Sequence, residues 1–432
     1  MTKIVISELS AFEVLDSRGN PTVSVEVKLS DGSSSISFVP SGASTGKYEA
    51  VELRDGNKEK FNGKGVSKAV NFINDQIRDL LIGLDPLNQV ENDRKLCDLD
   101  GTKNKSALGA NSILAASLAI LRASAVSKSI PLYEHVNSIH FEIFKEKKDP
   151  TLPVPMMNIL NGGAHADNKI DFQEFMIQPK GFKTFRSAMQ CGVEIYHNLK
   201  YLLKEEKLST SIGDEGGFAP DLESAEQALE FILKAIDISG YNPGEEVFIC
   251  LDPAASEFFN EGKYELKGSG QSLNSFEMVD YLKNLISKYP INSLEDGLDE
   301  DDWEGWQLLG RELGSKIQLV GDDVFATNPL RIERGIKEDV ANSVLIKINQ
   351  IGTVTEALKA AGLATQNNYK TVISHRSGET EDTSIADIAV GLSSGQIKTG
   401  APSRTDRVSK YNRLLILEDK FNIPYISEYE SR

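Results

Sequence analysis

The sequence predicts an α/β protein in which a TIM-like (β/α)₈ barrel, residues 156–432, follows an α+β N-terminal domain, residues 1–137. The chain of 432 residues is longer than one hydrophobic core usually serves. Its first part reads as strands followed by helices, whereas its second part alternates apolar runs with helical patterns. This alternation recurs every 23 to 28 residues, the length of one strand–helix–loop unit.

The N-terminal domain begins with strand patterns. Residues 23–29 alternate valine or leucine with polar residues, the period of a half-buried strand. The segment DSRGNP at 16–21 is a turn signal, and a third apolar run precedes the small-residue loop 41–46. Helical patterns follow at 66–82 and 107–127. The second is almost wholly apolar or small, so we expect it to be buried between layers.

Residues 138–155 are expected to connect the domains, because a charged stretch is followed there by three prolines that favour extended chain. Beyond this connector, Ser224, Asn274 and Thr353 each stand three residues before Gln or Glu, the spacing of N-terminal capping boxes. Regular alternation implies a parallel sheet, and the number of units favours a closed barrel. We expect barrel helices at 223–239, 275–288, 303–313, 329–338, 353–366 and 383–394.

The composition excludes several classes of function. With 47 basic and 64 acidic residues, the formal charge is −17, which disfavours nucleic acid and anionic membranes as partners. The three cysteines have no paired spacing and are expected to be free thiols in a reducing compartment. No apolar stretch approaches the length of a membrane span, and the N-terminus lacks a secretory signal. We therefore expect a cytoplasmic protein.

Each of the apolar runs in the second half of the chain ends at a charged residue. Because the carboxyl ends of parallel barrel strands meet at one rim, we expect these side chains to converge there. Carboxylates, lysines and an arginine on one rim indicate a metal ion next to an anion-binding site. The residues are Asp252, Glu295, Asp322, Lys347, His375, Arg376 and Lys398.

The three acids offer only oxygen ligands, which suit Mg²⁺ or Mn²⁺ and disfavour Zn²⁺. A single acid at a strand end is usually a helix cap or a surface charge, but three at successive strand ends favour a metal site. Two of the acids, at 295–296 and 322–323, belong to doublets, and strand alternation is expected to send one member of each inward. The pattern alone does not choose which.

Lys347 lies between apolar residues, and a lone lysine in such a strand usually forms a satisfied ion pair. Beside a metal rim, we expect burial and a neighbouring cation to lower its pKa and make it a base. Glycine-rich turns at 161–166 and 213–220 allow close backbone approach to a ligand, although plain turns explain them equally well. Glu174 and Glu215 beside these turns are candidate acids.

The segment 374–380, SHRSGET, joins a guanidinium to hydroxyl and backbone donors, which suits a phosphate or carboxylate. Together the residues predict a metal-assisted reaction on a small anion. Proton abstraction next to a carboxylate fits best, because a metal and two cations can hold the enolate dianion.

Several longer motifs resemble the enolase family, the glycolytic phosphopyruvate hydratases. The resemblance extends from DSRGNPTV to KYNRLLILE, nearly the whole chain. The motif LEDGLDEDDW, with Gly297 after its Glu-Asp pair, resembles the bacterial members of the family. The resemblance implies an enolase-type barrel and the reversible dehydration of 2-phospho-D-glycerate to phosphoenolpyruvate. The motifs are SGASTG, NGGAHADNK, QEFMIQP, GDEGGFAP, LEDGLDEDDW, VGDD, LIKINQIGTVTEAL, SHRSGETEDT and IKTGAPSRTDR.

The resemblance also implies a role for each site residue. Lys347 is the base that removes the C2 proton, and Glu215 is the acid for the leaving hydroxyl, assisted by Glu174. Asp252, Glu295 and Asp322 bind a first Mg²⁺, and Ser44 joins a second when its loop closes over substrate. The substrate-binding positions are His165, Gln173, His375, Arg376, Ser377 and Lys398.

Two alternatives stay open beside this assignment. Another dehydratase or racemase of the enolase superfamily would place different bases on the barrel and lack the SHRSGETEDT and IKTGAPSRTDR segments. A surface adhesin or plasminogen-binding role, with location at the cell surface or secretion without a signal peptide, is compatible with catalysis, although the chain ends in Ser431-Arg432 rather than lysine. The resemblance further implies a homodimer or an octamer.

Overall fold

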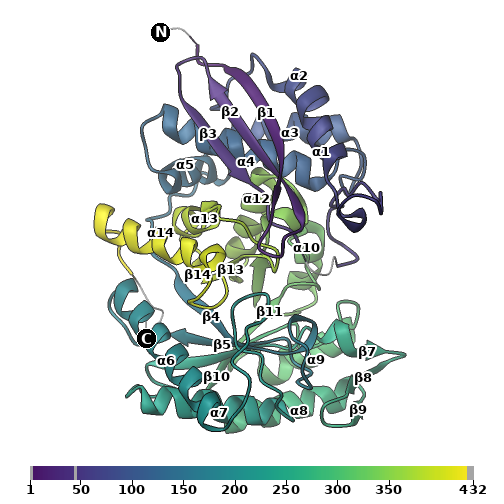
Figure 1. Ribbon diagram of the computed structural model, residues 1–432, viewed down its shortest axis with the longest axis vertical. Coiled ribbons are helices and arrows are strands. Elements are labelled where there is room, and N and C mark those ends of the chain that lie inside the picture. Colours follow the sequence, from purple (N-terminus) through teal and green to yellow (C-terminus); the bar gives the residue numbers. More distant parts are fainter. Residues whose placement is uncertain (1–2, 43–45, 426–432) are drawn as a thin grey trace.

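A computed structural model describes residues 3–42 and 46–425. Its N-terminal part contains an antiparallel sheet of β1 (Ile6–Leu15), β2 (Pro21–Leu29) and β3 (Ser34–Phe38), which confirms the predicted strands. The helices of this part lie at the same end of the molecule as the sheet (Figure 1), and the first, second and fourth of them pack on it. They are α1 (Ser67–Phe72), α2 (Arg78–Leu81), α3 (Gln89–Asp100), α4 (Ala110–Ser127) and α5 (Leu132–Phe144), with a π-helical segment, Ile73–Ile77, joining the first two.

Helix α4 is the core helix of this part, as its composition predicts. It packs on β2 and β3 and also contacts α3, α5 and the barrel helix α12. By length and composition alone it could cross a membrane, but 83% of it is buried inside the fold. A helix that is apolar on all sides needs such surroundings, because no face of it is suited to water.

The second part is a closed eight-stranded barrel, which confirms the predicted architecture. Its strands follow one another around the barrel in chain order. They are β4 (Val154–Asn161), β5 (Glu174–Pro179), β6 (Val247–Asp252), β10 (Ile291–Glu295), β11 (Gln318–Gly321), β12 (Ser343–Ile346), β13 (Lys370–Ser374) and β14 (Gly395–Lys398). A small antiparallel sheet, β7 (Phe259–Asn260), β8 (Lys263–Leu266) and β9 (Gln271–Leu273), is inserted after β6.

The expectation of a wholly parallel barrel is wrong for one strand. β5 runs antiparallel to both β4 and β6. The connection from β4 to β5 contains only a short 3₁₀ turn, Gly163–His165, and no crossover helix, so the chain cannot return to start a parallel strand. As a result Glu174, the first residue of β5, lies opposite Asp252, the last residue of β6.

Helices cover the outside of the barrel, and the six predicted barrel helices are confirmed within two residues at each end. Among the predicted capping boxes, Asn274 and Glu277 form the reciprocal pair, whereas Gln227 and Glu356 direct their side chains to other partners. Three helices, α6, the short α11 and α14, were not predicted. The helices are α6 (Phe185–Glu205), α7 (Ala225–Ile238), α8 (Ser275–Lys288), α9 (Trp303–Leu313), α10 (Pro329–Lys337), α11 (Ile348–Ile351), α12 (Val354–Gln366), α13 (Ser384–Leu392) and α14 (Thr405–Phe421).

The predicted connector is shorter than expected, because α5 continues to Phe144. Val136, Ile139 and His140 of this helix are buried, and the helix packs on α13 of the barrel, so tertiary contacts extend it. It ends where Lys145 adopts a left-handed conformation with φ of 57°. Extended chain then leads to β4.

Residues two apart along each strand build layers inside the barrel. At the lower end Gln178, Gln318 and Gln396 form a network of side-chain amides, with hydrogen bonds of 2.8 to 3.0 Å. The middle layer is apolar. The next inward position, at or directly after the strand end, carries a charge on six of the eight strands; it is Asn158 on β4 and Ser374 on β13. The middle layer consists of Met156, Met176, Cys250, Val320, Leu345 and Val372.

The two parts of the chain are joined by specific contacts. The Arg331 guanidinium of α10 lies 3.5 Å from the centre of the Tyr48 ring, and the Tyr48 hydroxyl donates to Asp301 at 2.6 Å. Asp93 of α3 accepts from the backbone N–H and hydroxyl of Thr355 at the start of α12.

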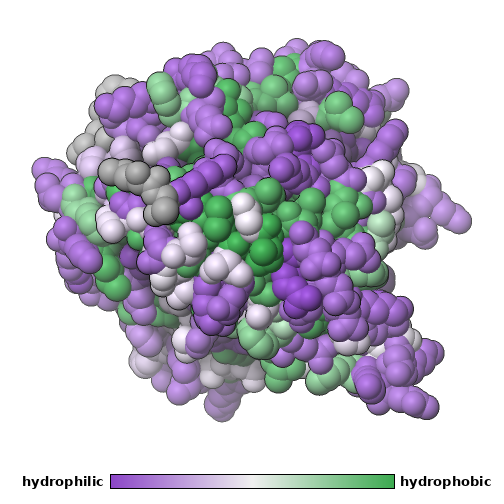
Figure 2. Space-filling model, turned by 90° about the horizontal axis from the view of Figure 1, so that it is seen from above, coloured by the Kyte–Doolittle hydropathy of each residue, from purple (hydrophilic) through white to green (hydrophobic). Residues whose placement is uncertain are grey.

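Viewed from above, the molecule shows hydrophobic residues gathered near the centre of this face between hydrophilic ones (Figure 2).

Candidate active site

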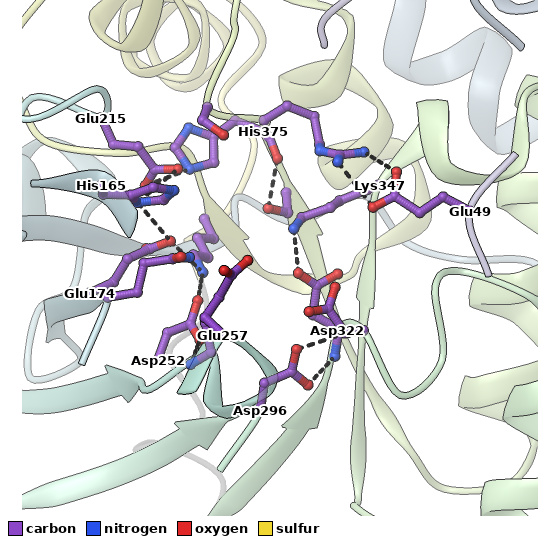
Figure 3. Close-up of a pocket in the computed structure, with 17 residues that line it drawn as sticks. Glu49, His165, Glu174, Glu215, Asp252, Glu257, Asp296, Asp322, Lys347 and His375 are labelled. Carbon is purple, nitrogen blue, oxygen red and sulfur yellow. Dashed lines mark hydrogen bonds and ion pairs between the residues drawn. The ribbon is translucent and has the colours of Figure 1, made fainter. Parts of the chain in front are cut away.

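The charged layer at the upper end of the barrel opens into a pocket (Figure 3). All but two of the predicted site residues line it. Glu295 belongs to the same charged layer but is fully buried, and Ser44 lies outside the residues that the structure describes. The predicted residues that line the pocket are His165, Gln173, Glu174, Glu215, Asp252, Asp322, Lys347, His375, Arg376, Ser377 and Lys398.

Lys398, at the end of β14, is the central cation of the pocket floor. Its ammonium Nζ lies 2.9 Å from Asp252, 2.8 Å from Glu295 and 3.1 Å from Glu174. Its side chain is only 2% exposed, and burial by itself would lower the pKa of this lysine. The surrounding carboxylates outweigh burial and raise its pKa well above the ordinary value. Lys398 is therefore a permanent positive charge.

Lys347 follows β12 and forms a close ion pair with Asp322. The other carboxylate oxygen of Asp322 accepts a hydrogen bond of 2.9 Å from the Gln350 side chain. The expectation that the pKa of Lys347 is lowered is wrong while Lys347 is paired with Asp322. Burial acts in that direction, but the Asp322 carboxylate holds the pKa of Lys347 above its ordinary value.

The acidic doublets do not follow strand alternation. Asp296 has φ of 40°, so the strand geometry ends at Glu295, and the Asp322–Asp323 pair comes after β11 has ended. Asp296 and both members of the second doublet line the pocket. The Asp296 carboxylate accepts the backbone N–H groups of Asp322 and Asp323 at 2.9 and 2.8 Å, and so holds the second doublet in place.

The donor set fits hard divalent cations. Among the described residues that line the pocket, eight carboxyl groups face only three cationic side chains. One carboxylate oxygen of Glu295, Oε2, is buried without a hydrogen-bond partner. Burial and neighbouring carboxylates raise the pKa of Glu295 and Asp296 well above their ordinary values, and that of Asp323 to about 8. A divalent cation would relieve this repulsion.

Two groups of ligand atoms within 4.8 Å of one another could hold a metal ion among the described residues. One comprises Asp296, Asp322 and Asp323, and the other His165, Glu174 and Glu215. The first shares only Asp322 with the predicted ligand set, because Asp252 and Glu295 are drawn to Lys398 in this structure.

Glu174 and Glu215 form a carboxyl pair across the pocket from Lys347 (Figure 3). His165 Nδ1 lies 3.8 Å from Glu174 and 3.9 Å from Glu215. Burial and the charge of Glu215 raise the pKa of Glu174 well above its ordinary value. Burial also acts to raise the pKa of Glu215, but His375 and His165 hold it well below its ordinary range. Glu174 is therefore the more easily protonated member of this pair.

Arg376 follows β13 and is paired with a residue that the sequence did not predict. The Glu49 carboxylate, from the N-terminal part of the chain, accepts from both terminal nitrogens of Arg376 at 2.9 and 3.0 Å. Asn349 accepts a further hydrogen bond of 2.9 Å from the same guanidinium. A carboxylate thus lies against the group that is expected to bind an anion.

Several pocket residues were missed by sequence reasoning. Asp296 and Asp323 stand beside predicted residues, and their doublets were the available signal. Glu257 follows β6 in a 3₁₀ turn, and Glu49 belongs to the other part of the chain. Neither carries a pattern that would have identified it.

The chain matches two family models. Residues 6–136 match the N-terminal domain of enolase, and residues 149–429 match the enolase C-terminal TIM barrel domain. The matches cover nearly the whole chain and agree with the closed barrel and its acidic, metal-compatible rim. The chain therefore belongs to the enolase family.

Proposed function

We propose that this protein is a magnesium-dependent hydro-lyase that reversibly dehydrates 2-phospho-D-glycerate to phosphoenolpyruvate, as in glycolysis and gluconeogenesis. The observation that carries the proposal is the placement of Lys347 and of the Glu174–Glu215 pair on opposite sides of one pocket (Figure 3). Loss of a proton from C2 and a hydroxyl from C3 requires a base and an acid at neighbouring carbon atoms. Membership of the enolase family supports this reaction.

Lys347 is the proposed base for the C2 proton. Its ion pair with Asp322 keeps it in the cationic form, in which it cannot accept a proton. Asp322 is also a proposed metal ligand. Lys347 therefore becomes a base only when the charge of Asp322 is engaged elsewhere, which links its activity to occupation of the metal site.

Asp252, Glu295 and Asp322 would hold the first Mg²⁺, and Ser44 would join the second. When bound, Mg²⁺ would stabilise the negative charge that develops on the substrate carboxylate as the C2 proton leaves. The excess of carboxyl groups in the pocket and the unpartnered Glu295 oxygen support this ligand set.

Arg376, Ser377 and His375 form the proposed phosphate side of the site. A planar guanidinium suits a phosphate because it offers two parallel donors. The Glu49 carboxylate uses these donors at rest, so the phosphate would have to replace or join it. Lys398 would lie near the substrate carboxylate, with Gln173 and His165 completing the site.

Glu215 is the proposed acid for the C3 hydroxyl, and Glu174 assists it. A proton shared by the pair would reside on Glu174 rather than on Glu215, because the two pKa values are shifted in opposite directions. Glu215 must receive this proton, or another, before it can donate. His165 lies between the two carboxyl groups and is suited to connect them.

The decisive experiment measures phosphoenolpyruvate formation from 2-phospho-D-glycerate by ultraviolet absorbance, using the purified protein. We expect turnover with Mg²⁺, none after chelation, and recovery when Mg²⁺ is returned. No turnover with Mg²⁺ would reject the reaction. Turnover that resists the chelator would reject the metal assignment alone.

A parallel assay addresses the other members of the enolase superfamily. These would act on a carboxylic acid without the phosphate, so the protein should be offered non-phosphorylated hydroxy acids under the same conditions. Activity on these compounds, and none on 2-phospho-D-glycerate, would favour the superfamily alternative.

The remaining expectations belong to this proposal. An enzyme of central metabolism would be cytoplasmic, and a homodimer or octamer is expected. Phe12, Leu15 and Ile36 on β1 and β3 are 46%, 59% and 42% exposed, and such apolar residues are compatible with a subunit contact. Plasminogen binding at the cell surface stays a prediction, and no feature of residues 3–42 and 46–425 favours it.

A further inference from the structure

Arg407, at the start of α14, is a buried cation next to the proposed acid, and the mechanism above does not use it. Its side chain has no exposed surface. Its terminal nitrogens donate to the backbone carbonyls of Arg376, Ser377 and Asp214 at 2.5, 2.6 and 3.1 Å. One guanidinium therefore joins the loop that carries Glu215 to the loop that carries the phosphate-side residues.

The same guanidinium contacts the ring of His375. Nη1 of Arg407 lies 2.6 Å from Nδ1 of His375. An arginine has no acceptor, so a hydrogen bond at this distance requires an unprotonated Nδ1. The proton of a neutral His375 must then be on Nε2, which lies 3.2 Å from Oε2 of Glu215.

Oε2 of Glu215 thereby faces two donors. The Asn158 side-chain amide donates to it at 3.1 Å, and the Nε2–H group of His375 lies 3.2 Å away, close enough to interact but outside hydrogen-bond geometry. A proton on Oε2 would have no acceptor to point to. The other oxygen, Oε1, lies on the side of His165, whose Nδ1 is 3.9 Å away.

We propose that Arg407 is a positioning residue that fixes His375 as the Nε2–H tautomer and so directs the acidic proton of Glu215 to Oε1. This rests on the proposed role of Glu215 as the acid. Oε1 is on the side of the carboxylate from which Glu174 and His165 are reached, so the proton arrives there and leaves towards substrate from the same atom.

Burial, helped by two neighbouring cations, keeps His375 neutral. Burial lowers the pKa of His375 to about 3; among its charged neighbours, Glu215 opposes this shift, while Arg407 and Lys398 add to it. Protonation at Nδ1 would place an N–H group against the N–H of Arg407 at 2.6 Å, without an acceptor between them. Three backbone carbonyls that accept from its terminal nitrogens keep the guanidinium oriented, and Asp406 adds a negative charge 2.9 Å from Nε on its other side.

Arg407 could instead serve only to hold the two loops together, so the test must report on the imidazole itself. The protein has five histidines, and ¹⁵N-labelled histidine with NMR distinguishes the two neutral tautomers and the cation. His375→Gln assigns the ring by loss of its signals. We expect the proton of His375 on Nε2 throughout the neutral pH range in the wild-type protein. A proton on Nδ1, or a cationic ring, would overturn the proposal.

A double-mutant cycle then tests the effect on catalysis. Arg407→Lys keeps a positive charge but not the fixed fork of donors, and we expect it to lower kcat by on the order of 10²-fold. KM should change little, and the ring should become a mixture of tautomers. Glutamine at 375 has an amide in place of Nε2–H and no tautomer to select. In the His375→Gln background, Arg407→Lys should therefore lower kcat by less than about threefold, which is within the usual error of additivity.

Equal losses in both backgrounds would reduce Arg407 to a structural role and overturn the proposal. If Arg407→Lys does not fold, the wild-type NMR spectrum still decides the tautomer. The outcome is also separable from the proposed reaction, because the tautomer is measured without turnover. A protein that forms no phosphoenolpyruvate but carries the proton on Nε2 would reject the reaction and leave the geometry of His375 intact.

Discussion

At the scale of single residues, the site is controlled by which carboxylate each cation contacts. Lys398 is surrounded by three carboxylates, whereas Lys347 depends on Asp322. This difference separates the two lysines chemically. Lys398 keeps its proton whatever happens to one neighbour, but Lys347 loses its stabilisation when Asp322 binds a different cation.

Isotope exchange tests the separate roles of base and acid. Lys347→Ala should abolish both turnover and exchange of the C2 proton with solvent, because no other group replaces the base. Glu215→Gln should lower dehydration by at least about 10²-fold while C2 exchange survives. Exchange is measured by loss of deuterium from substrate labelled at C2. The exposed Lys359→Ala on α12 is the matched control and should behave as wild type. Retained exchange in Lys347→Ala would remove that residue from the base role.

The pairing of Glu49 with Arg376 leads to a prediction on anion affinity. Glu49→Gln removes the charge that competes for the guanidinium, so inorganic phosphate should bind about five- to tenfold more tightly. Isothermal titration calorimetry measures this directly. Glu52→Gln makes the same change in charge nearby, on a residue paired with Arg54, and should have a smaller effect. Weaker phosphate binding in Glu49→Gln would show that Glu49 orients Arg376 rather than competing for it.

At the scale of elements, local signals explain where several helices begin. α8 starts with Asn274, whose side chain accepts the Glu277 N–H at 3.1 Å, while the Glu277 carboxylate accepts the Asn274 N–H at 2.8 Å. This reciprocal arrangement satisfies two backbone donors that the helix itself cannot. By contrast, α12 also relies on Asp93 from another helix to accept the Thr355 N–H.

Removing this local cap should have a local effect. Asn274→Ala should destabilise α8 by about 1 kcal/mol, because the exposed Glu277 backbone N–H loses its acceptor. Hydrogen exchange at the Glu277 amide should accelerate, with catalytic activity unchanged. Asn274→Ser keeps a capping oxygen and serves as the control. Equal exchange rates in the alanine and serine variants would mean that tertiary packing alone defines the start of the helix.

At the scale of the whole molecule, buried titratable groups make stability depend on pH. His135 of α5 is buried, its Nδ1 lies 3.5 Å from the Lys128 ammonium, and its Nε2 has no hydrogen-bond partner. Burial, followed by the charge of Lys128, lowers its pKa from 6.5 to about 4. Between these values the unfolded chain binds the proton more tightly than the folded protein does. The stability present above pH 6.5 is therefore lost progressively as the pH falls towards 4.

Replacement of His135 should weaken this dependence. Between pH 7.5 and pH 5.5 the wild-type protein should lose up to about 1 kcal/mol more stability than His135→Gln, because only the wild type carries the titrating ring. Urea denaturation at the two pH values gives the comparison, and His197→Gln is the control. Equal pH dependence in the wild type and in His135→Gln would contradict a buried neutral imidazole.

Much of the rim could be predicted because it depends on strand period and strand order. Asp252, Asp322, Lys347 and Lys398 each lie at or just after the end of a barrel strand, and inward positions repeat every two residues. The same rule failed for Asp296 and Asp323, which lie where the strands have already ended. Glu174 reaches the rim only because β5 is antiparallel, which the apolar pattern could not reveal.

The sequence by itself determined the two-part architecture, the closed barrel and the charged ends of its strands, because periodicity and connection length are local properties. Only the tertiary structure decided the partners of those charges. Glu49 beside Arg376, Asp296 beneath Asp322, and Arg407 against His375 are each separated from their partner by 26 or more residues. The electrostatics of a buried group depend on its neighbours in space, so the pKa of Lys347 could not be inferred from its neighbours along the chain.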